Sequence, residues 1–184
     1  MEEKVNKKKY IVIAVIIMLA VSILGTLAWY TYGTKKSSLV LILGDTEELL
    51  ITLSPYQLDI VADPVTTYTS MTDYVTVTAV NRKAESTTFK LYYDIEEIDS
   101  VLASTSMKYA VTRSTSKNGT YTEVTNGSFS GATNGQHKEI YNENIPSNTT
   151  YYYKIYTYLD GNSSNSSMEG KTLNTTIGAD LPSG

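Results

Sequence analysis

Hydrophobic and polar positions divide the chain into two parts of different character. From Ile11 to Ala28 it carries eighteen residues without a charge. At about 1.5 Å per helical residue, this run spans roughly 27 Å, close to the thickness of the hydrocarbon core of a bilayer. Trp29, Tyr30 and Tyr32 follow the run, as aromatic residues do at a membrane interface. The pattern predicts a transmembrane helix or signal peptide over residues 10–32.

Basic residues precede this segment. Four lysines lie between residues 4 and 9, and such a cluster is retained in the cytoplasm. We therefore expect residues 1–9 to be cytoplasmic and the chain beyond the helix to be exported. Two fates of the helix stay open: eighteen apolar residues suit a permanent signal anchor, whereas the small residues Thr26 and Ala28 suit cleavage by a signal peptidase. Residues 33–38 then form a short polar linker.

Beyond the linker, the apolar residues occur in short runs. Val, Ile, Leu, Tyr and Thr dominate these runs, and Gly, Asn, Asp, Ser and Pro separate them, which is typical of β-strands and turns. In residues 74–80, valine or alanine occupies every second position, so one side of a strand there is apolar. The predicted strands are Leu39–Leu43, Leu49–Leu53, Tyr56–Val61, Tyr74–Val80, Thr88–Ile95, Met107–Arg113, Thr120–Val124, Tyr151–Leu159 and Lys171–Ile177.

The segments between the strands carry three further predictions. Asn118-Gly119 favours a hairpin turn between the sixth and seventh predicted strands. Residues 127–148, which begin with many Ser, Gly, Thr and Asn, predict a long surface loop. In residues 94–105, apolar side chains recur at spacings of three and four, which predicts a short helix.

These elements predict one all-β domain over residues 39–184. About nine strands and one short helix favour two antiparallel sheets packed face to face. A jelly roll and an immunoglobulin-like sandwich both fit the pattern. About 150 residues are enough for one domain with a substantial core.

Charge is distributed unevenly along the chain. Residues 1–36 carry six lysines and two glutamates, so residues 37–184 carry a net charge of −8, although the whole chain carries only −4. A surface of that sign repels phosphates, so we do not expect nucleic acid as a partner. The chain has no cysteine, and its stability must therefore come from packing.

Three stretches carry a family resemblance. Residues 25–30 read Gly-Thr-Leu-Ala-Trp-Tyr, residues 74–81 form an alternating strand that ends in Asn, and residues 153–162 end in an acidic Gly turn. They resemble the TasA and camelysin family of exported surface and biofilm-matrix proteins. In that family the dedicated signal peptidase SipW cuts after the alanine of the first motif, which here lies between Ala28 and Trp29. Residues 105–148 show no match to it.

The resemblance implies a jelly-roll domain that is either released or held at a bacterial cell surface. In some members of the family this domain polymerises into extracellular fibres. In such fibres the N-terminal segment, here Trp29 to Leu43, adds as a strand to the next subunit.

Three groups of polar residues are candidates for chemistry. His137 is the only histidine, so a catalytic triad has to include it, but its polar surroundings favour a solvated loop residue. The four acidic residues between Asp94 and Asp99 are candidates for Ca²⁺ ligands, yet they lack the spacing of an EF-hand and are interpreted as a solvated face. Asp160-Gly161-Asn162 suits a tight turn better than a metal site. The sequence thus predicts no catalytic residue, no metal site and no cofactor.

Tyrosine is unusually frequent, with sixteen residues against two phenylalanines. In the strand predicted at residues 151–159, alternation places Tyr152, Tyr156 and Tyr158 on one face, together with Lys154, and the core residues on the other. A contiguous exposed aromatic area commonly marks a contact surface, so this stripe is a candidate face for a sugar, a protein or a neighbouring subunit. Packing against aromatic residues of adjacent strands is the alternative.

We interpret the chain as an exported, non-catalytic β-sandwich protein of a bacterial-type cell surface or extracellular matrix, with a structural or adhesive and fibre-forming role. The alternative is a membrane-tethered binding module that recognises glycan or protein through its tyrosine-rich strand. A third hypothesis, a surface hydrolase, depends on His137 or the acidic cluster. The expected partners are the membrane, other copies of the chain, and surface proteins or glycans.

Overall fold

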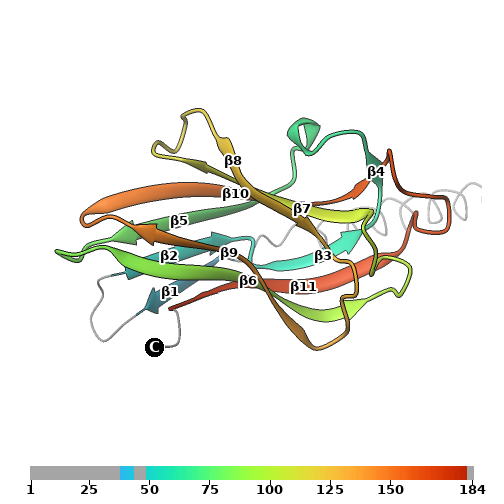
Figure 1. The fold of residues 1–184 in the computed structure, drawn as a ribbon, viewed down its shortest axis with the longest axis horizontal. Helices are drawn as coiled ribbons and strands as arrows, with labels where there is room; N and C mark the ends of the chain where they lie inside the picture. Colours follow the sequence, from blue (N-terminus) through green and yellow to red (C-terminus); the bar gives the residue numbers. More distant parts are fainter. Residues whose placement is uncertain (1–37, 44–48, 182–184) are drawn as a thin grey trace, which may run out of the picture. The chain divides into compact units, whose positions relative to one another are not determined.

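The computed structural model describes residues 38–43 and 49–181, which form eleven strands and one turn of 3-10 helix (Figure 1). In chain order the elements are β1 (Leu39–Leu43), β2 (Leu49–Ser54), β3 (Gln57–Val61), β4 (Pro64–Val65), η1 (Tyr68–Ser70), β5 (Val75–Asn81), β6 (Thr87–Ile98), β7 (Met107–Ser114), β8 (Thr122–Ser128), β9 (Gln136–Ile145), β10 (Thr149–Asp160) and β11 (Thr172–Asp180).

The membrane segment predicted at residues 10–32 lies outside the described residues. The cleavage candidates Ala28 and Trp29 and the linker up to residue 37 also lie outside them. Within the described residues, no helix has the length and apolar character needed to cross a bilayer.

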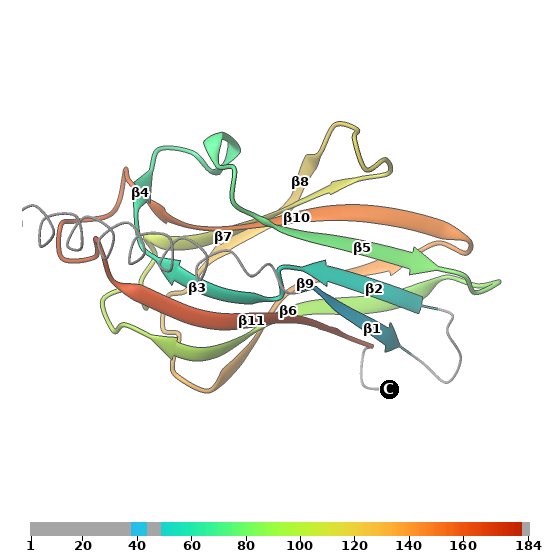
Figure 2. The same ribbon diagram turned by 180° about the vertical axis from the view of Figure 1, so that it is seen from behind.

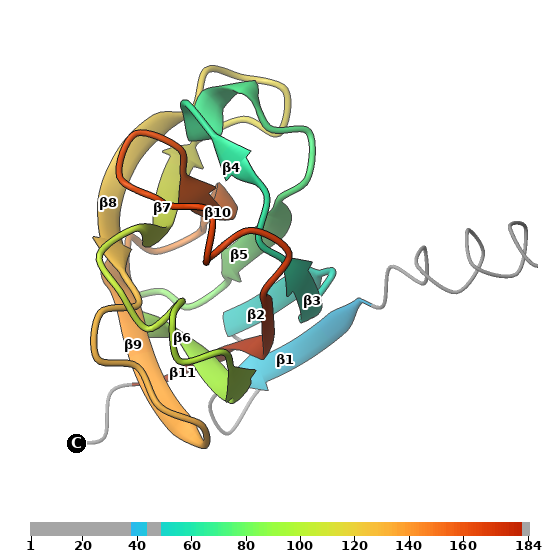
Figure 3. The ribbon, with the colours of Figure 1, turned by 90° about the vertical axis from the view of Figure 1, so that its right-hand side faces the viewer.

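Two sheets form a sandwich. Sheet A has the strand order β1-β2-β5-β10-β7-β8, and sheet B has the order β3-β11-β6-β9. The short β4 runs parallel to the end of β10, whereas the other strand pairs of the described chain are antiparallel. Figure 2 shows β1 at the edge of sheet A, and Figure 3 shows β8 and β9 meeting at the opposite side of the sandwich. The predicted all-β fold of two antiparallel sheets is confirmed.

The chain changes sheet after almost every strand or hairpin. It passes from β2 to β3 in sheet B, returns to sheet A for β4 and β5, and repeats such crossings up to β11. The last two strands therefore occupy interior positions. β10 lies between β5 and β7 in sheet A, and β11 lies between β3 and β6 in sheet B.

Alternating apolar side chains from both sheets form the core. In β2, Leu49, Ile51 and Leu53 are fully buried, and the residues between them are partly exposed. Phe89 of sheet B and Tyr153 of sheet A meet edge to face across the sandwich, with their ring centroids 5.7 Å apart. Burying a large apolar side chain contributes about 1.5–3 kcal/mol. Packing of this kind stabilises a chain that has no cysteine.

All nine predicted strands are present, at or within a few residues of their predicted bounds. The predicted hairpin is also confirmed, because β7 pairs with β8 in antiparallel fashion and Asn118-Gly119 lies in the connection between them. In this turn the Gly119 amide donates to the carbonyl oxygen of Ser116 at 3.0 Å.

The helix predicted at residues 94–105 is wrong, because β6 continues to Ile98 and irregular turns follow it. The cause is a β-bulge. Ile95 pairs with Thr175 and Glu97 with Asn174, so Glu96 is an extra residue. Two successive glutamates face outward there, and the buried Ile95 and Ile98 become separated by three positions, which is a helical spacing.

The long loop predicted at residues 127–148 is also wrong, because β9 occupies much of it. β9 is the edge strand of sheet B and pairs only with β6 among the described strands. Ile140 and Ile145 are its only buried residues. Edge strands commonly carry polar and charged residues, so the apolar alternation that identifies a strand is weak here.

Candidate functional site

The tyrosine-rich strand β10 separates its side chains onto two faces as predicted. Tyr153, Ile155 and Leu159 point into the core and are fully or almost fully buried. Tyr152, Lys154, Tyr156 and Tyr158 belong to the opposite face, which is the outer surface of sheet A. Because β10 lies between β5 and β7, these side chains project from the middle of the sheet.

Three further tyrosines gather on the same surface from other parts of the chain. Tyr68 lies in η1, Tyr74 just precedes β5, and Tyr121 just precedes β8. We call the resulting surface the tyrosine face. Its members are Tyr68, Tyr74, Tyr121, Tyr152, Tyr156 and Tyr158.

Neighbouring rings of the tyrosine face are in contact. The ring of Tyr68 lies 5.1 Å from that of Tyr156 and 5.9 Å from that of Tyr158, and Tyr74 lies 5.3 Å from Tyr156, all measured between ring centroids. Tyr156 is consequently only 8% exposed, whereas the other members are partly exposed. Aromatic packing therefore coexists with rings that remain partly exposed.

Small side chains of β7 flank the stripe. Ala110 lies directly opposite Tyr156, Thr112 opposite Lys154, and Ser114 opposite Tyr152. Residues opposite each other in an antiparallel pair share one face of the sheet, so at these three positions the side chains of β10 are longer than those opposite them. Opposite Tyr158 lies Lys108, whose side chain is also long.

Lys154 lies within the tyrosine face. Its ammonium nitrogen is 4.4 Å from the ring centroid of Tyr74 and 4.5 Å from that of Tyr121. Both distances are within the range of a cation–π contact. Among the described residues, carboxylates pair with basic side chains such as Lys90, Lys108 and Arg113, but none pairs with Lys154.

Tyr68 is held over the stripe by a hydrogen bond from its hydroxyl to Glu123 of β8, at 2.6 Å. Asn126 donates to the other oxygen of the same carboxylate, also at 2.6 Å. Burial and the hydrogen bond to Glu123 raise the pKa of Tyr68 to about 12. The hydroxyl therefore remains protonated, and remains a donor, throughout the physiological pH range.

Asp160 anchors one end of the tyrosine face. Its carboxylate accepts hydrogen bonds from the Lys108 ammonium at 2.6 Å, from the Asn162 amide at 3.0 Å and from the Ser163 hydroxyl at 3.0 Å. These donors, with the Lys108 contact first among them, hold the pKa of Asp160 well below its usual range. The residues Asp160-Gly161-Asn162 form a tight turn, as expected, and the Asp160 carboxylate is occupied within it.

His137 lies on β9 and not in a loop, so its predicted position is wrong, although the side chain is exposed as expected. Its Nδ1 atom is 2.7 Å from Asp94 of β6, which is one of the four acidic candidates. Its ring lies 4.1 Å from that of Tyr92. The Tyr92 ring crosses Gly178, where a Cβ atom would have no room. Among the described residues, no group of three or more acidic, His or Cys side chains is placed to hold a metal.

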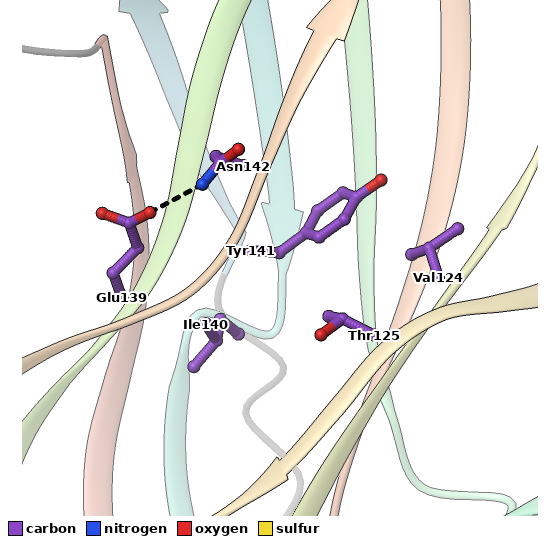
Figure 4. Close-up of a pocket in the computed structure, with 6 residues that line it drawn as sticks. All are labelled: Val124, Thr125, Glu139, Ile140, Tyr141 and Asn142. Carbon is purple, nitrogen blue, oxygen red and sulfur yellow. Dashed lines mark hydrogen bonds between the residues drawn. The ribbon is translucent and has the colours of Figure 1, made fainter.

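A shallow depression of about 330 Å³ lies where the edge strands β8 and β9 meet (Figure 4). It is lined by Val124 and Thr125 from β8 and by Glu139, Ile140, Tyr141 and Asn142 from β9. None of the site residues predicted from the sequence lines it.

The sequence interpretation missed a polar connection between the sheets. Glu143 of β9 forms an ion pair with Arg113 of β7 and accepts hydrogen bonds from the Tyr153 hydroxyl at 2.7 Å and the Tyr141 hydroxyl at 2.9 Å. The Arg113 guanidinium also lies 4.7 Å from the Tyr151 ring centroid. The sequence offers no signal for this cluster, because the pairing that places Glu143 opposite Phe89 follows from the register of β6 and β9.

Comparisons with known proteins identify no family. No family model matches the chain, and no curated protein sequence matches it. Its fold is similar to that of the CBM22-2 xylan-binding domain of Xyn10C from Paenibacillus barcinonensis, with a TM-score of 0.32, 10% identity, and coverage of 80% of this chain and 88% of that domain. It is also similar to CBM28, a carbohydrate-binding module specific for non-crystalline cellulose, with a TM-score of 0.35, 11% identity, and coverage of 81% and 84%. With likenesses this distant, ligand and activity must be argued from the chain's own residues.

Proposed function

We propose that this chain is an exported, non-catalytic binding module that holds a glycan on its tyrosine face. The observation that carries the proposal is the gathering of six tyrosines from four separate segments of the chain on the outer surface of one sheet. Core packing alone does not require aromatic side chains on the outer face of a sheet. A contiguous aromatic surface that remains partly exposed is typical of a contact site.

The chemistry of the tyrosine face suits a sugar. A tyrosine offers an apolar ring and a polar hydroxyl, and a pyranose offers an apolar C–H face and a rim of hydroxyls. Tyr158 is partly exposed and stands beside the Tyr68 ring, while Tyr156 underneath is buried. The upper rings therefore meet the ligand, and Tyr156 supports them from a central strand of a rigid sheet.

We expect Tyr158→Ala to weaken glycan binding by about ten-fold, because it removes one partly exposed ring of this surface. Binding of the full chain in detergent is measured by interferometry on immobilised hydroxyethyl cellulose, xylan and polygalacturonate. Tyr92→Ala is the matched control, since Tyr92 is a partly exposed tyrosine on the outer face of sheet B. Equal losses in both variants, or none in either, would contradict the assignment of the site.

A specific feature of sheet A supports fibre formation as a second candidate function. β1 is an edge strand that pairs only with β2 among the described strands, and its Val40 is 55% exposed. An edge of this kind is a template for adding another strand. Leu39–Leu43 belongs to the segment that the family resemblance assigns to subunit addition, and here it pairs with its own chain.

For this second function we expect cleavage after Ala28 and self-association of the released protein. The measurement is the intact mass and N-terminal sequence of protein recovered from the envelope and medium of a host that carries a cognate signal peptidase, followed by light scattering. A chain that begins at Trp29 and forms growing assemblies supports the fibre. An intact, monomeric chain in the membrane contradicts it and favours a tethered binding module.

A further inference from the structure

We infer that the tyrosine face selects polysaccharides that carry carboxylate groups, and that Lys154 is the residue that recognises the charge. The inference rests on the proposed function, because it names the class of glycan bound at the same site. It depends on the contacts of Lys154 and on the hydrogen bonds that the neighbouring carboxylates of Asp160 and Glu123 already accept.

The partners of Lys154 differ from those of other lysines in the sheets. Lys90 pairs with Glu139 at 2.8 Å, and Lys108 pairs with Asp160 at 2.6 Å. Lys154 instead lies between the rings of Tyr74 and Tyr121, and no carboxylate of the described residues is within ion-pair distance of it. A cation–π contact orients an ammonium group but leaves its positive charge intact.

Two acidic side chains beside the tyrosine face, Asp160 and Glu123, are already engaged. Asp160 is bound by Lys108 and by the turn that follows it, and Glu123 accepts hydrogen bonds from Tyr68 and Asn126. Among the residues that the structure describes, Lys154 of the tyrosine face thus has no anionic partner, although residues 37–184 carry a net charge of −8. That overall charge repels acidic polymers, so a local cation is needed to hold one.

A sugar ring that bears a carboxylate is the ligand that matches both the tyrosine rings and the Lys154 ammonium. The ring stacks on exposed tyrosines, and the carboxylate accepts a charge-assisted hydrogen bond from Lys154, whose ammonium has three donors. A uronic acid residue combines both features in one unit. Lys154 lies two residues from Tyr156 and four from Tyr158 on the same face of β10, so rings and charge are contiguous.

The test compares oligogalacturonates with their methyl esters, in which each carboxylate is replaced by an uncharged ester. Binding of both probes to the full chain is measured in detergent. We expect the unmodified protein to bind the acid at least about ten-fold more tightly than the ester. Lys154→Met, which keeps an apolar side chain of similar length, is expected to lose this preference while retaining binding of the ester. Lys154→Arg keeps the positive charge and is expected to keep the preference for the acid over the ester.

Lys117→Met is the matched control, because Lys117 is an exposed lysine in the turn between β7 and β8 and its loss changes the net charge equally. Thermal unfolding of each variant verifies that the fold is retained. If Lys154→Met keeps the preference for the acid, or if the unmodified protein binds neither probe or both equally, the inference is overturned. If instead Tyr158→Ala binds every glycan as well as the unmodified protein does, the proposed function itself fails.

Discussion

Replacing Glu143 with alanine is expected to lower the free energy of unfolding by about 3–5 kcal/mol. The Glu143 side chain is 11% exposed and is bound by Arg113, Tyr141 and Tyr153. Since Tyr153 is fully buried in the folded protein, its hydroxyl would be left without its acceptor. Arg113 would at the same time lose its carboxylate partner. The network joins β9 of sheet B to β7 and β10 of sheet A, so its loss weakens the packing of the two sheets.

Urea denaturation of the variant measures this effect. Glu139→Ala is the matched control on the same strand, because Glu139 pairs with Lys90 at the surface, where both side chains are more than one-third exposed. An exposed pair of this kind contributes about 1 kcal/mol or less. If Glu143→Ala were no more destabilising than Glu139→Ala, the network would not stabilise the fold.

Raising the pH above 10 is expected to unfold the protein cooperatively, at about pH 11 to 12. Burial is the first cause of raised tyrosine pKa values at nine positions: Tyr68, Tyr92, Tyr93, Tyr109, Tyr121, Tyr141, Tyr153, Tyr156 and Tyr158. Below pH 10 these hydroxyls are protonated in both states and have no effect. Above it the unfolded chain releases their protons first, so stability falls as the pH rises. Each unit of pKa difference changes stability by about 1.4 kcal/mol.

Circular dichroism and tyrosinate absorbance, recorded together in a pH titration, measure this transition. The nine tyrosines should ionise in step with unfolding. Tyr109→Phe removes one hydroxyl whose pKa is raised by burial and which makes no side-chain hydrogen bond among the described residues. We therefore expect this variant to unfold at a higher pH than the unmodified protein. Its melting temperature at pH 7 should be almost unchanged. Ionisation of all tyrosines near pH 10 in a protein that stays folded would be evidence against the buried arrangement.

The sequence was sufficient to predict the strands whose apolar residues alternate strictly. In β2 and β5 each second residue is buried, and both strands lie in the interior of a sheet. It was insufficient where pairing with another strand changes the local period. The bulge at Glu96 depends on β11, about 80 residues away, and β9 is polar because one of its edges is unpaired. Neither the bulge nor the edge position of β9 can be recognised from the residues that are adjacent in the sequence.

The candidate site was predictable in part for a similar reason. Tyr152, Tyr156 and Tyr158 lie on one strand, so alternation alone places them on one face. Tyr68 comes from η1 and Tyr121 from the loop before β8, and only the strand order brings them to that face. The partner of Tyr68, Glu123, is 55 residues away in the sequence. Contacts over such separations require the topology and not only the pattern.

The interior positions of β10 and β11 have a consequence for the time at which the chain folds. A nascent chain that ends before Thr149 lacks a central strand of sheet A and of sheet B, so neither sheet is continuous. Pairing between such distant segments is slow, because a large loop must close before any contact forms. The domain therefore folds after synthesis of residues 149–180 and not progressively from its N-terminus. A chain truncated before Thr149 is therefore expected to remain without either complete sheet.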